Sequence, residues 1–284
     1  MPDLPLQPAL AADFSARLAA YRPTAAHHDR VFAEFTALTQ ADPVLAAHRR
    51  HVEARQLGYG DPAFHALWAR LLATAHAQFG RVDALEIGVF KGQVISLWAL
   101  LAREHGWPVR VHAITPLAGQ PLPAARWWRS LLFRLSPRFR ERVASGDFYA
   151  DDDYEKILRT HFAAHRLSFD DVRLLRGYST DDAVRAQVAA DRFHLLYIDG
   201  DHTYAGARAD LEHYAPKVVP GGWLVMDDAA HDQPGTTFWK GYETVARACR
   251  LLPALGFKPV FAVGHNRVFQ READSSSTGV PPVV

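Results

Sequence analysis

The order of apolar and polar positions along the chain predicts an α/β fold in which strands and helices alternate. Short, continuous apolar runs are typical of strands that are buried on both faces of a parallel sheet. Runs of this kind cover residues 193–198 and 223–226, and further strands are expected over residues 82–87, 109–114 and 172–175. Helical patterns lie between them, over residues 92–104, 154–164, 180–190 and 204–214. This alternation predicts a mostly parallel, Rossmann-like sheet with helices on both faces.

The two ends of the chain depart from this alternation. Residues 1–60 predict an amino-terminal helical extension, and Asp61-Pro62 opens a further helix with apolar residues at helical spacing. The last elements expected are a helix and two strands, over residues 238–252, 257–263 and 267–270. The α/β domain is therefore expected to span residues 61–272, and the serine-rich tail, 273–284, is expected to be disordered.

The stretch from about residue 117 to residue 170 is too long for a simple connection between two strands. It contains a basic, tryptophan-rich segment at residues 126–134 and the acidic run Asp151-Asp152-Asp153. Acidic residues favour the start of a helix, which supports a helix over residues 154–164. We expect an insertion over the active edge of the sheet, in which the tryptophan-rich segment packs into the core or contacts a second subunit.

Composition excludes several classes of partner. The 284 residues carry 32 basic and 31 acidic side chains, so no global charge attracts nucleic acid or an anionic membrane. Cys249 is the one cysteine, which excludes an intrachain disulfide and a cysteine metal cluster. The chain also lacks a signal-peptide pattern and an apolar run long enough to span a bilayer. We expect a cytoplasmic protein whose partner is a small molecule; a homo-oligomer stays open.

Acidic residues follow two of the predicted strands. Asp199-Gly200-Asp201-His202 comes directly after the strand at residues 193–198, and Asp227-Asp228 after the strand at 223–226. The carboxyl ends of parallel strands meet at the edge where open α/β folds bind ligands. Asp199, Asp227 and Asp228 offer oxygen ligands of the kind that Mg²⁺ prefers, with His202 as a nearby base. Simpler readings are a helix cap at Asp199, a solvated turn at the acidic pair, and a histidine without a catalytic role.

A glycine-containing loop, Glu86-Ile87-Gly88-Val89-Phe90-Lys91-Gly92, joins the first strand of the domain to the helix that follows. Glycine permits a tight turn and a close approach of a ligand to the backbone, and free amides at a helix start bind anions. The spacing is neither that of a dinucleotide-binding fold nor that of a phosphate-binding P-loop. Taken alone, the loop is equally consistent with a purely structural turn.

Three segments, taken in order, resemble class I S-adenosylmethionine-dependent methyltransferases. They are the glycine loop, the run Tyr197-Ile198-Asp199-Gly200-Asp201-His202, and Pro220-Gly221-Gly222 with Asp227-Asp228. More narrowly, they are similar to the metal-dependent sugar and macrocin O-methyltransferases, to which cephalosporin hydroxylase-like proteins are related. The resemblance covers residues 60–272. It implies methyl transfer from S-adenosylmethionine to a hydroxyl of a sugar or another polyhydroxylated small molecule, assisted by Mg²⁺ or another divalent ion.

The resemblance also implies a role for each site residue. Ser179, after the third strand, would lie near the adenine of the cofactor, and His202 matches the general base of the sugar-modifying members. With a pKa near its reference value of about 6.5, His202 would accept the hydroxyl proton at neutral pH. The positions that match the metal ligands are Asp199, Asp227 and Asp228. Those that match the methionine-binding loop are Glu86, Gly88, Phe90 and Gly92.

One position departs from the family pattern. The second strand of such proteins usually ends in an acid that bonds both ribose hydroxyls, whereas here it ends in Thr115-Pro116. The Thr115 hydroxyl can make one of these bonds but cannot accept from both hydroxyls in bidentate fashion. Two alternatives therefore stay open: a non-methylating protein that binds a nucleoside or glycan on the same fold, and a cephalosporin hydroxylase-like metal protein.

Overall fold

A computed structural model describes residues 6–117, 131, 134–137 and 153–273. Its sheet has seven strands in the order β3-β2-β1-β4-β5-β7-β6. The first five strands are parallel, and β7 is antiparallel to both of its neighbours. The strands are β1 (Val82–Ile87), β2 (Val109–Thr115), β3 (Arg173–Arg176), β4 (Phe193–Ile198), β5 (Val218–Met226), β6 (Phe257–Val263) and β7 (Asn266–Arg271). The predicted mostly parallel, Rossmann-like sheet is confirmed.

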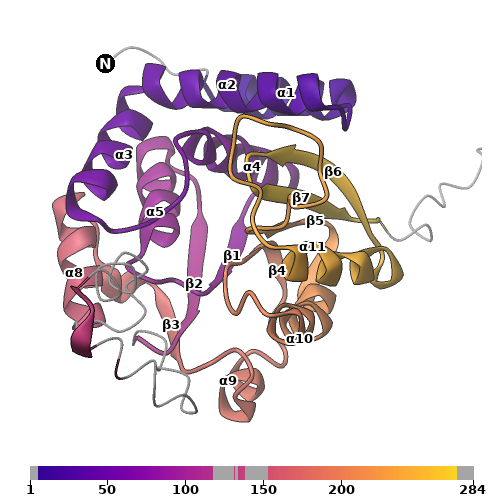
Figure 1. Ribbon diagram of the computed structural model, residues 1–284. Helices are drawn as coiled ribbons and strands as arrows, with labels where there is room; N and C mark the ends of the chain where they lie inside the picture. The colour runs from indigo at the N-terminus through magenta and orange to yellow at the C-terminus, as the bar shows by residue number, and fades with distance from the viewer. Residues whose placement is uncertain (1–5, 118–130, 132–133, 138–152, 274–284) are drawn as a thin grey trace, which may run out of the picture.

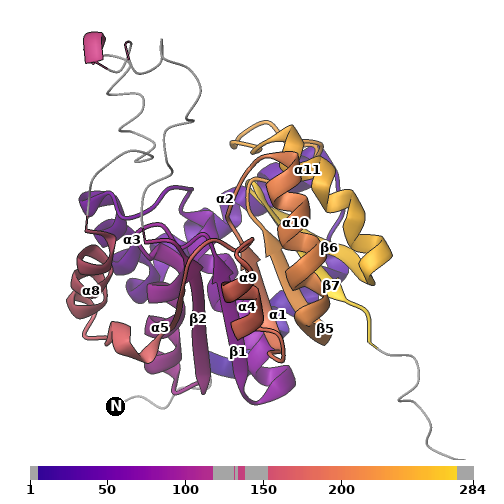
Figure 2. The ribbon, with the colours of Figure 1, turned by 90° about the horizontal axis from the view of Figure 1, so that it is seen from below.

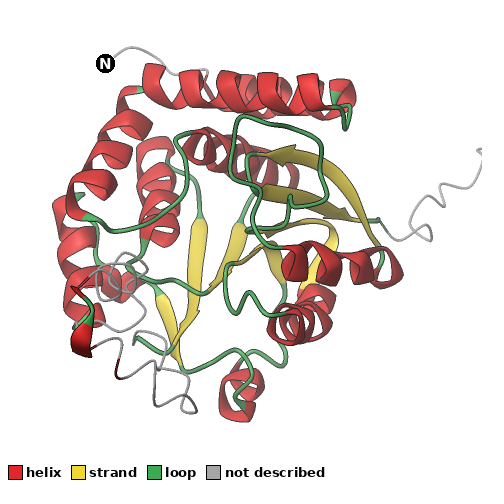
Figure 3. Cartoon of the chain, in the orientation of Figure 1, coloured by secondary structure: helices red, strands yellow, loops and turns green. Residues whose placement is uncertain are grey.

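Helices cover both faces of the sheet (Figures 1 and 3). The α-helices are α1 (Leu6–Ala20), α2 (Ala25–Ala41), α3 (Pro43–Arg55), α4 (Ala63–Phe79), α5 (Gln93–His105), α8 (Tyr154–Ala164), α9 (Asp182–Gln187), α10 (Tyr204–Tyr214) and α11 (Glu243–Ala248). Short 3₁₀ helices are η1 (Phe169–Asp171), η2 (Ala215–Lys217) and η3 (Cys249–Leu255). Figure 1 shows α1 and α2 beyond one face and α9 and α10 beyond the other, and Figure 2 brings α9 and α10 to the front.

The period-2 geometry of the strands divides the core into two layers. Along β4, Leu195 and Tyr197 belong to a cluster with residues of α4 and α5, such as Trp68 and Trp98. Their neighbours Leu196 and Ile198 belong to a second cluster, which includes residues of α10 and α11. Both faces of the central strands are thus buried, which explains why their sequences are mostly apolar.

The amino-terminal helices pack into the first of these layers. The ring of Phe14 in α1 lies 6.2 Å from that of Trp223 in β5 and 5.3 Å from that of Phe261 in β6, measured between ring centroids. Phe35 in α2 lies 5.5 Å from the same Phe261 ring. The extension therefore shares its hydrophobic core with the sheet.

Two local predictions were wrong. The helix expected over residues 238–252 begins only at Glu243 and continues as the 3₁₀ helix η3, because Gly241 instead forms a bridge with Ala229. The helix expected over residues 180–190 is shorter, and its N-cap residue Asp181 makes no cap bond, because the Asp181 carboxylate accepts the N–H of Tyr178 at 2.8 Å instead. Residues 274–284 of the expected tail and most of the tryptophan-rich segment lie outside the described residues.

Candidate active site

The register of the parallel strands brings three loops together at the carboxyl edge of the sheet. Ile87 of β1 pairs with Ile114 of β2 and with Ile198 of β4, and Ile198 pairs with Met226 of β5. The hydrogen-bond ladder continues one residue beyond each strand, through backbone N–H groups that donate to backbone carbonyls at 2.8–3.1 Å. These bonds run from Gly88 to Ile114, from Asp199 to Ile87 and from Asp227 to Ile198. The loops that carry the predicted site residues therefore start side by side.

Steric limits fix the shape of the glycine loop (residues 86–92). Gly88 has a φ of 90°, and a Cβ there would lie 1.8 Å from the Asp199 carbonyl oxygen. Gly92, the N-cap of α5, has a φ of 86°, and its Cβ would lie 2.3 Å from a methyl of Leu158. Phe90 also has a positive φ, of 48°, and its ring stacks on Tyr59. The loop thus presses against the strand end that carries Asp199.

Glu86 places a buried carboxylate beneath this loop. It accepts a backbone hydrogen bond from Ile95 in the first turn of α5, while its Oε2 has no hydrogen-bond partner within the described protein. Burial raises the pKa of Glu86 well above its usual value, and the charges of Asp199 and Asp227 raise it further. A buried polar atom without a partner requires an explanation, and a cationic or N–H-bearing ligand group would supply one. The ammonium group of S-adenosylmethionine fits this description.

Three carboxylates and two imidazoles form the centre of the site. His202 Nε2 lies 3.2 Å from Asp199 Oδ1 and 3.8 Å from Asp228 Oδ2. His265 Nε2, from the β6–β7 turn, lies 3.2 Å from Asp227 Oδ1. The donor atoms of Asp199, His202 and Asp227 all lie within 4.8 Å of one another, and so do those of Asp227, Asp228 and His265. This donor set fits a divalent cation.

The charges of this cluster depend strongly on one another. Burial raises the pKa of Asp199, to about 7, and also raises the pKa of Asp228. The negative charge of Asp227 raises both pKa values further. Burial also acts to raise the pKa of Asp227, but the ion pair with His265 outweighs it and lowers that pKa. The pKa of His265 is well above its usual value: burial opposes this, and Asp227 and Asp61 produce it. The imidazolium groups thus act as the counter-charges of the acids.

His202 departs from the sequence-based expectation of an ordinary pKa. Burial alone would lower its pKa, but Asp199 and Asp228 raise it to about 9. The ring is consequently protonated at neutral pH in this arrangement and has no lone pair to accept a proton. His202 is able to act as a base only where another cation takes over the two carboxylates.

The helix-cap reading of Asp199 does not hold. The N-cap of α10 is Thr203, whose hydroxyl accepts the N–H of Gly206 at 3.1 Å. Asp201, in the same motif, accepts the N–H of Thr203 at 2.8 Å and stays exposed. Of the two acids after β4, only Asp199 therefore belongs to the acidic cluster.

Thr115 and Ser179 lie at the ends of β2 and β3. Thr115 is buried, and its hydroxyl accepts the N–H of Leu117 at 3.3 Å. The carbonyl of Ser179 accepts hydrogen bonds from Tyr214 Oη, at 2.8 Å, and from Arg185 Nε, at 3.1 Å. Contacts of either residue with the ribose or the adenine stay predictions.

Two aromatic residues beside the acids were missed by sequence reasoning. Trp239 Nε1 donates to Asp228 Oδ1 at 3.1 Å, and the ring of Tyr242 stacks on His202 with 5.0 Å between centroids. Trp239 is 61% exposed and Tyr242 43%, so their faces are open to solvent. Both fall in the region wrongly expected to be helical. The sequence did contain a sign of their role, because these two aromatic residues stand on either side of Gly241, soon after the acidic pair Asp227-Asp228.

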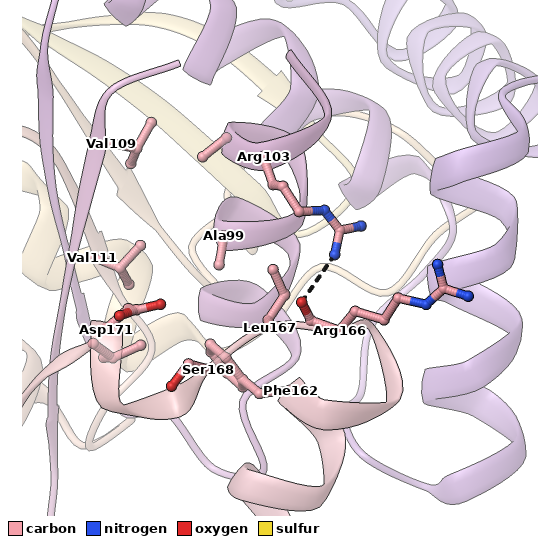
Figure 4. Close-up of a pocket in the computed structure, with 11 residues that line it drawn as sticks. Ala99, Arg103, Val109, Val111, Phe162, Arg166, Leu167, Ser168 and Asp171 are labelled. Atoms are coloured by element: carbon pink, nitrogen blue, oxygen red, sulfur yellow. Dashed lines mark hydrogen bonds between the residues drawn. The ribbon is translucent and has the colours of Figure 1, made fainter. Parts of the chain in front are cut away.

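A hollow of about 260 Å³ lies elsewhere, between α5, β2 and the chain that follows α8 (Figure 4). Apolar side chains such as Val109 and Phe162 line it, together with Arg103, which donates to the Arg166 carbonyl at 3.2 Å. Val109 starts β2, whereas the site residues follow the opposite ends of the strands. The hollow contains none of the predicted site residues.

Comparison with known proteins identifies the family. The model of the methyltransferase domain family matches residues 85–229, which is just over half of the chain and runs from the end of β1 to the acidic pair. Among curated proteins, none matches this sequence. In the described part of the chain, no helix has the length and apolarity needed to cross a membrane.

Several solved structures share the fold. The O-methyltransferase NovP has a TM-score of 0.54 and 18% identity, over 73% of this chain and 79% of NovP. A protein from Corynebacterium glutamicum has a TM-score of 0.53 and 17% identity, over 87% of this chain and 97% of its own. Cofactor-bound Rv0187 from MTB has a TM-score of 0.50 and 17% identity, over 84% of this chain and 95% of its own. The chain therefore belongs to the methyltransferase domain family and is a class I S-adenosylmethionine-dependent methyltransferase.

Proposed function

We propose that this methyltransferase acts on a hydroxyl of a sugar or another polyhydroxylated small molecule, with a divalent cation held by Asp199, Asp227 and Asp228. The observation that carries the proposal is the convergence of these carboxylates beside the glycine loop. Donor atoms of Asp199 and Asp227 lie within 4.8 Å of each other, as do those of Asp227 and Asp228, and the backbone of Asp199 lies against Gly88. Because the metal site and the cofactor loop are in direct contact, they would hold the acceptor and the methyl donor next to each other.

The ligand chemistry favours Mg²⁺. Carboxylate oxygens are the ligands of Mg²⁺, Ca²⁺ and Mn²⁺, whereas imidazoles suit later transition metals. His202 and His265 are held as ion-pair partners of the acids, which leaves the oxygens as the main donors. When bound, such a cation lowers the pKa of an acceptor hydroxyl.

Two residues of the chain would then have separate roles in binding the cofactor and in accepting the proton. Glu86 would orient the ammonium group of S-adenosylmethionine through its unpartnered oxygen. Once the cation occupies the carboxylates that now pair with His202, this imidazole would accept the proton of the acceptor hydroxyl, since it lies within 4 Å of two of the proposed metal ligands. Alignment of the acceptor oxygen with the methyl group would supply much of the rate.

The exposed faces of Trp239 and Tyr242 support a sugar as acceptor. Binding sites for small molecules commonly combine aromatic faces with a few fixed polar groups. Here Trp239 is hydrogen-bonded to Asp228 and Tyr242 is stacked on His202, so both rings are held next to the acids. The related fold of NovP, an O-methyltransferase, agrees with a hydroxyl acceptor.

The experiment is a transfer assay with labelled S-adenosylmethionine and a panel of sugar-bearing acceptors, with and without Mg²⁺. We expect transfer that requires the ion, and its loss in Asp199→Asn. Asp201→Asn is the matched control, because its carboxylate lies in the same motif but only binds the Thr203 backbone. Metal-independent transfer, or equal activity of both variants, would contradict the metal role.

One position tests the cofactor assignment. Thr115 stands at the end of β2, where the family resemblance implies an acid that bonds the ribose hydroxyls. Isothermal titration with S-adenosylmethionine, with and without Mg²⁺, measures the consequence: absence of binding under both conditions would favour a protein that binds a nucleoside or glycan on the same fold without methyl transfer.

A further inference from the structure

A cluster of histidines contacts the glycine loop and shares no residue with the acidic cluster. It comprises His48 and His51 in α3, His65 in α4, His161 in α8 and His165 at the end of α8. His48, His65 and His161 are almost completely buried. The rings touch: those of His48 and His165 are stacked 4.8 Å apart, and His51 stacks on His161 at 5.3 Å. The proposed methyl transfer uses none of these side chains.

Three of these imidazoles present nitrogens at metal-binding spacing. One ring nitrogen each of His48, His161 and His165 lies within 4.8 Å of the other two. A tetrahedral ion with metal–nitrogen bonds of about 2.0–2.1 Å needs its ligand nitrogens about 3.4 Å apart. A bound ion would therefore hold the three nitrogens closer together than this upper limit of 4.8 Å.

The remaining ring nitrogens are oriented as metal ligands require. His161 Nδ1 donates to the Lys91 carbonyl at 3.2 Å, which leaves a lone pair on its Nε2. His48 Nδ1 lies 3.0 Å from His65 Nε2, and the Nε2 atoms of His48 and His161 both face the Ser96 hydroxyl, at 3.0 and 3.3 Å. Metal-bound histidines usually donate their second N–H to a carbonyl or a similar acceptor in this way.

Hydrogen bonds alone do not account for the whole cluster. A chain of hydrogen bonds from His65 through His48 and Ser96 to His161 leaves His65 Nδ1 without a partner within the described protein, and His165 lies outside this chain. His165 Nε2 is buried without a hydrogen-bond partner within the described protein. The end of α8 is also held in place, since Arg103 donates to the carbonyl of His165 and to that of Arg166; Figure 4 shows the second of these bonds. An unpartnered nitrogen on an anchored segment points to a ligand that the protein itself does not supply.

The chemistry of the cluster differs from that of the acidic edge. Within the described part of the chain, none of its imidazoles forms an ion pair with a carboxylate. Burial lowers the pKa of His161 and of His165 to about 4, so both rings are neutral at pH 7. Neutral nitrogen donors without oxygens suit Zn²⁺, Co²⁺ and Ni²⁺ rather than Mg²⁺.

We propose that His48, His161 and His165 bind one divalent transition-metal ion of the zinc class, with the Ser96 hydroxyl or a water in the fourth position. The ion would join α3 of the amino-terminal extension to α8. It would also brace the glycine loop, because His161 bonds the carbonyl of Lys91. Its role is structural, and it does not depend on the proposed acceptor or on the acidic edge.

Cobalt provides the test, because tetrahedral Co²⁺ absorbs visible light far more strongly than octahedral Co²⁺. Protein stripped with a chelator and titrated with Co²⁺ should show one equivalent with a tetrahedral band, which Zn²⁺ displaces. The melting temperature should rise with Zn²⁺. His165→Ala should lose both effects, as should the size-conserving His165→Gln, while circular dichroism reports that each variant is folded.

Two controls locate the ion. His213→Ala removes a comparable half-buried helical histidine on α10, and Asp228→Asn weakens the acidic edge; both should keep the cobalt band. The proposal is overturned if wild-type protein binds no Co²⁺, or if the folded His165 variants keep the band. It is equally overturned if Asp228→Asn abolishes the band, because the ion would then belong to the acidic edge.

Discussion

The backbone at Gly88 touches the backbone at Asp199 so closely that no side chain fits between them. A Cβ on Gly88 would lie 1.8 Å from the Asp199 carbonyl oxygen, and the residue has a φ of 90°. Gly88 belongs to the loop assigned to the cofactor, and Asp199 to the cluster assigned to the metal. Because of this contact, a displacement of the cofactor loop would also displace the segment that carries the proposed metal ligand Asp199.

Gly88→Ala tests the contact between the glycine loop and Asp199. The methyl group must push the glycine loop away from Asp199, and the left-handed backbone adds strain, so we expect a loss of at least about 2 kcal/mol of stability. S-adenosylmethionine affinity should fall at least tenfold in isothermal titration. Gly106→Ala is the control: φ is also positive, at 67°, but nothing lies within 4 Å of the added Cβ. It should lose only about 1 kcal/mol and keep its cofactor affinity. Equal affinities for the two variants would refute the contact.

The pKa of His202 should depend on Asp199. Asp199 accepts from the imidazole and carries a neighbouring charge, and together with Asp228 it raises the pKa of His202 to about 9. Asp199→Asn removes that charge, so the pKa of His202 should move down toward its reference value of about 6.5. A nuclear magnetic resonance titration of the ring nitrogens measures this, with Asp201→Asn as control. An unchanged pKa in Asp199→Asn would mean that the pair is absent in solution.

Asp210 provides a prediction of pH-dependent stability. This residue of α10 is buried against Gly200, and burial raises its pKa to about 6. The folded state therefore holds the proton more tightly than the unfolded state, where the pKa is near 3.8, and stability from this group is lost as pH rises through 6. A shift of this size corresponds to at most about 3 kcal/mol.

Asp210→Asn should consequently raise the melting temperature at pH 8, and the gain should shrink toward pH 4, where the aspartate is already neutral. Calorimetry at several pH values measures the trend. Glu212→Gln, an exposed substitution on the same helix, should show no such trend. A gain for Asp210→Asn that does not depend on pH would contradict the assigned cause.

Trp239 should act on the acceptor and not on the cofactor. Removing its exposed face in Trp239→Ala should raise the KM for a sugar-bearing acceptor about 3- to 10-fold, the effect expected for an aromatic contact. The affinity for S-adenosylmethionine should stay the same. Trp239→Phe keeps an aromatic face but loses the hydrogen bond to Asp228, so it should retain most of the acceptor affinity. A KM unaffected by Trp239→Ala would remove this residue from the acceptor site.

The parts of the fold that depend on local pattern were predictable. The strands Val82–Ile87 and Phe193–Ile198 match the expected ranges because short, mostly apolar segments have few other stable positions in an α/β fold. The convergence of Asp199 with Asp227 followed from parallel register, since the strand ends lie at one edge. The family resemblance and the α/β fold rest on these features.

Features that depend on tertiary contacts were not predictable. His265 reaches Asp227 only because the β6–β7 hairpin folds back beside β5, which no local pattern specifies. The raised pKa of His202 arises from carboxylates on two different loops. The histidine cluster joins residues as distant as His48 and His165, and their burial becomes visible only once α3 and α8 are packed together.

The central claim is that Asp199, Asp227 and Asp228 hold one divalent cation beside the glycine loop. Mn²⁺ binding followed by electron paramagnetic resonance, together with anomalous scattering from Mn²⁺-soaked crystals, tests it most directly. We predict one Mn²⁺ that Mg²⁺ displaces, with an anomalous peak between these three carboxylates, and its loss in Asp199→Asn but not in Asp201→Asn. Absence of the peak there, or unchanged Mn²⁺ binding by Asp199→Asn, would contradict the account.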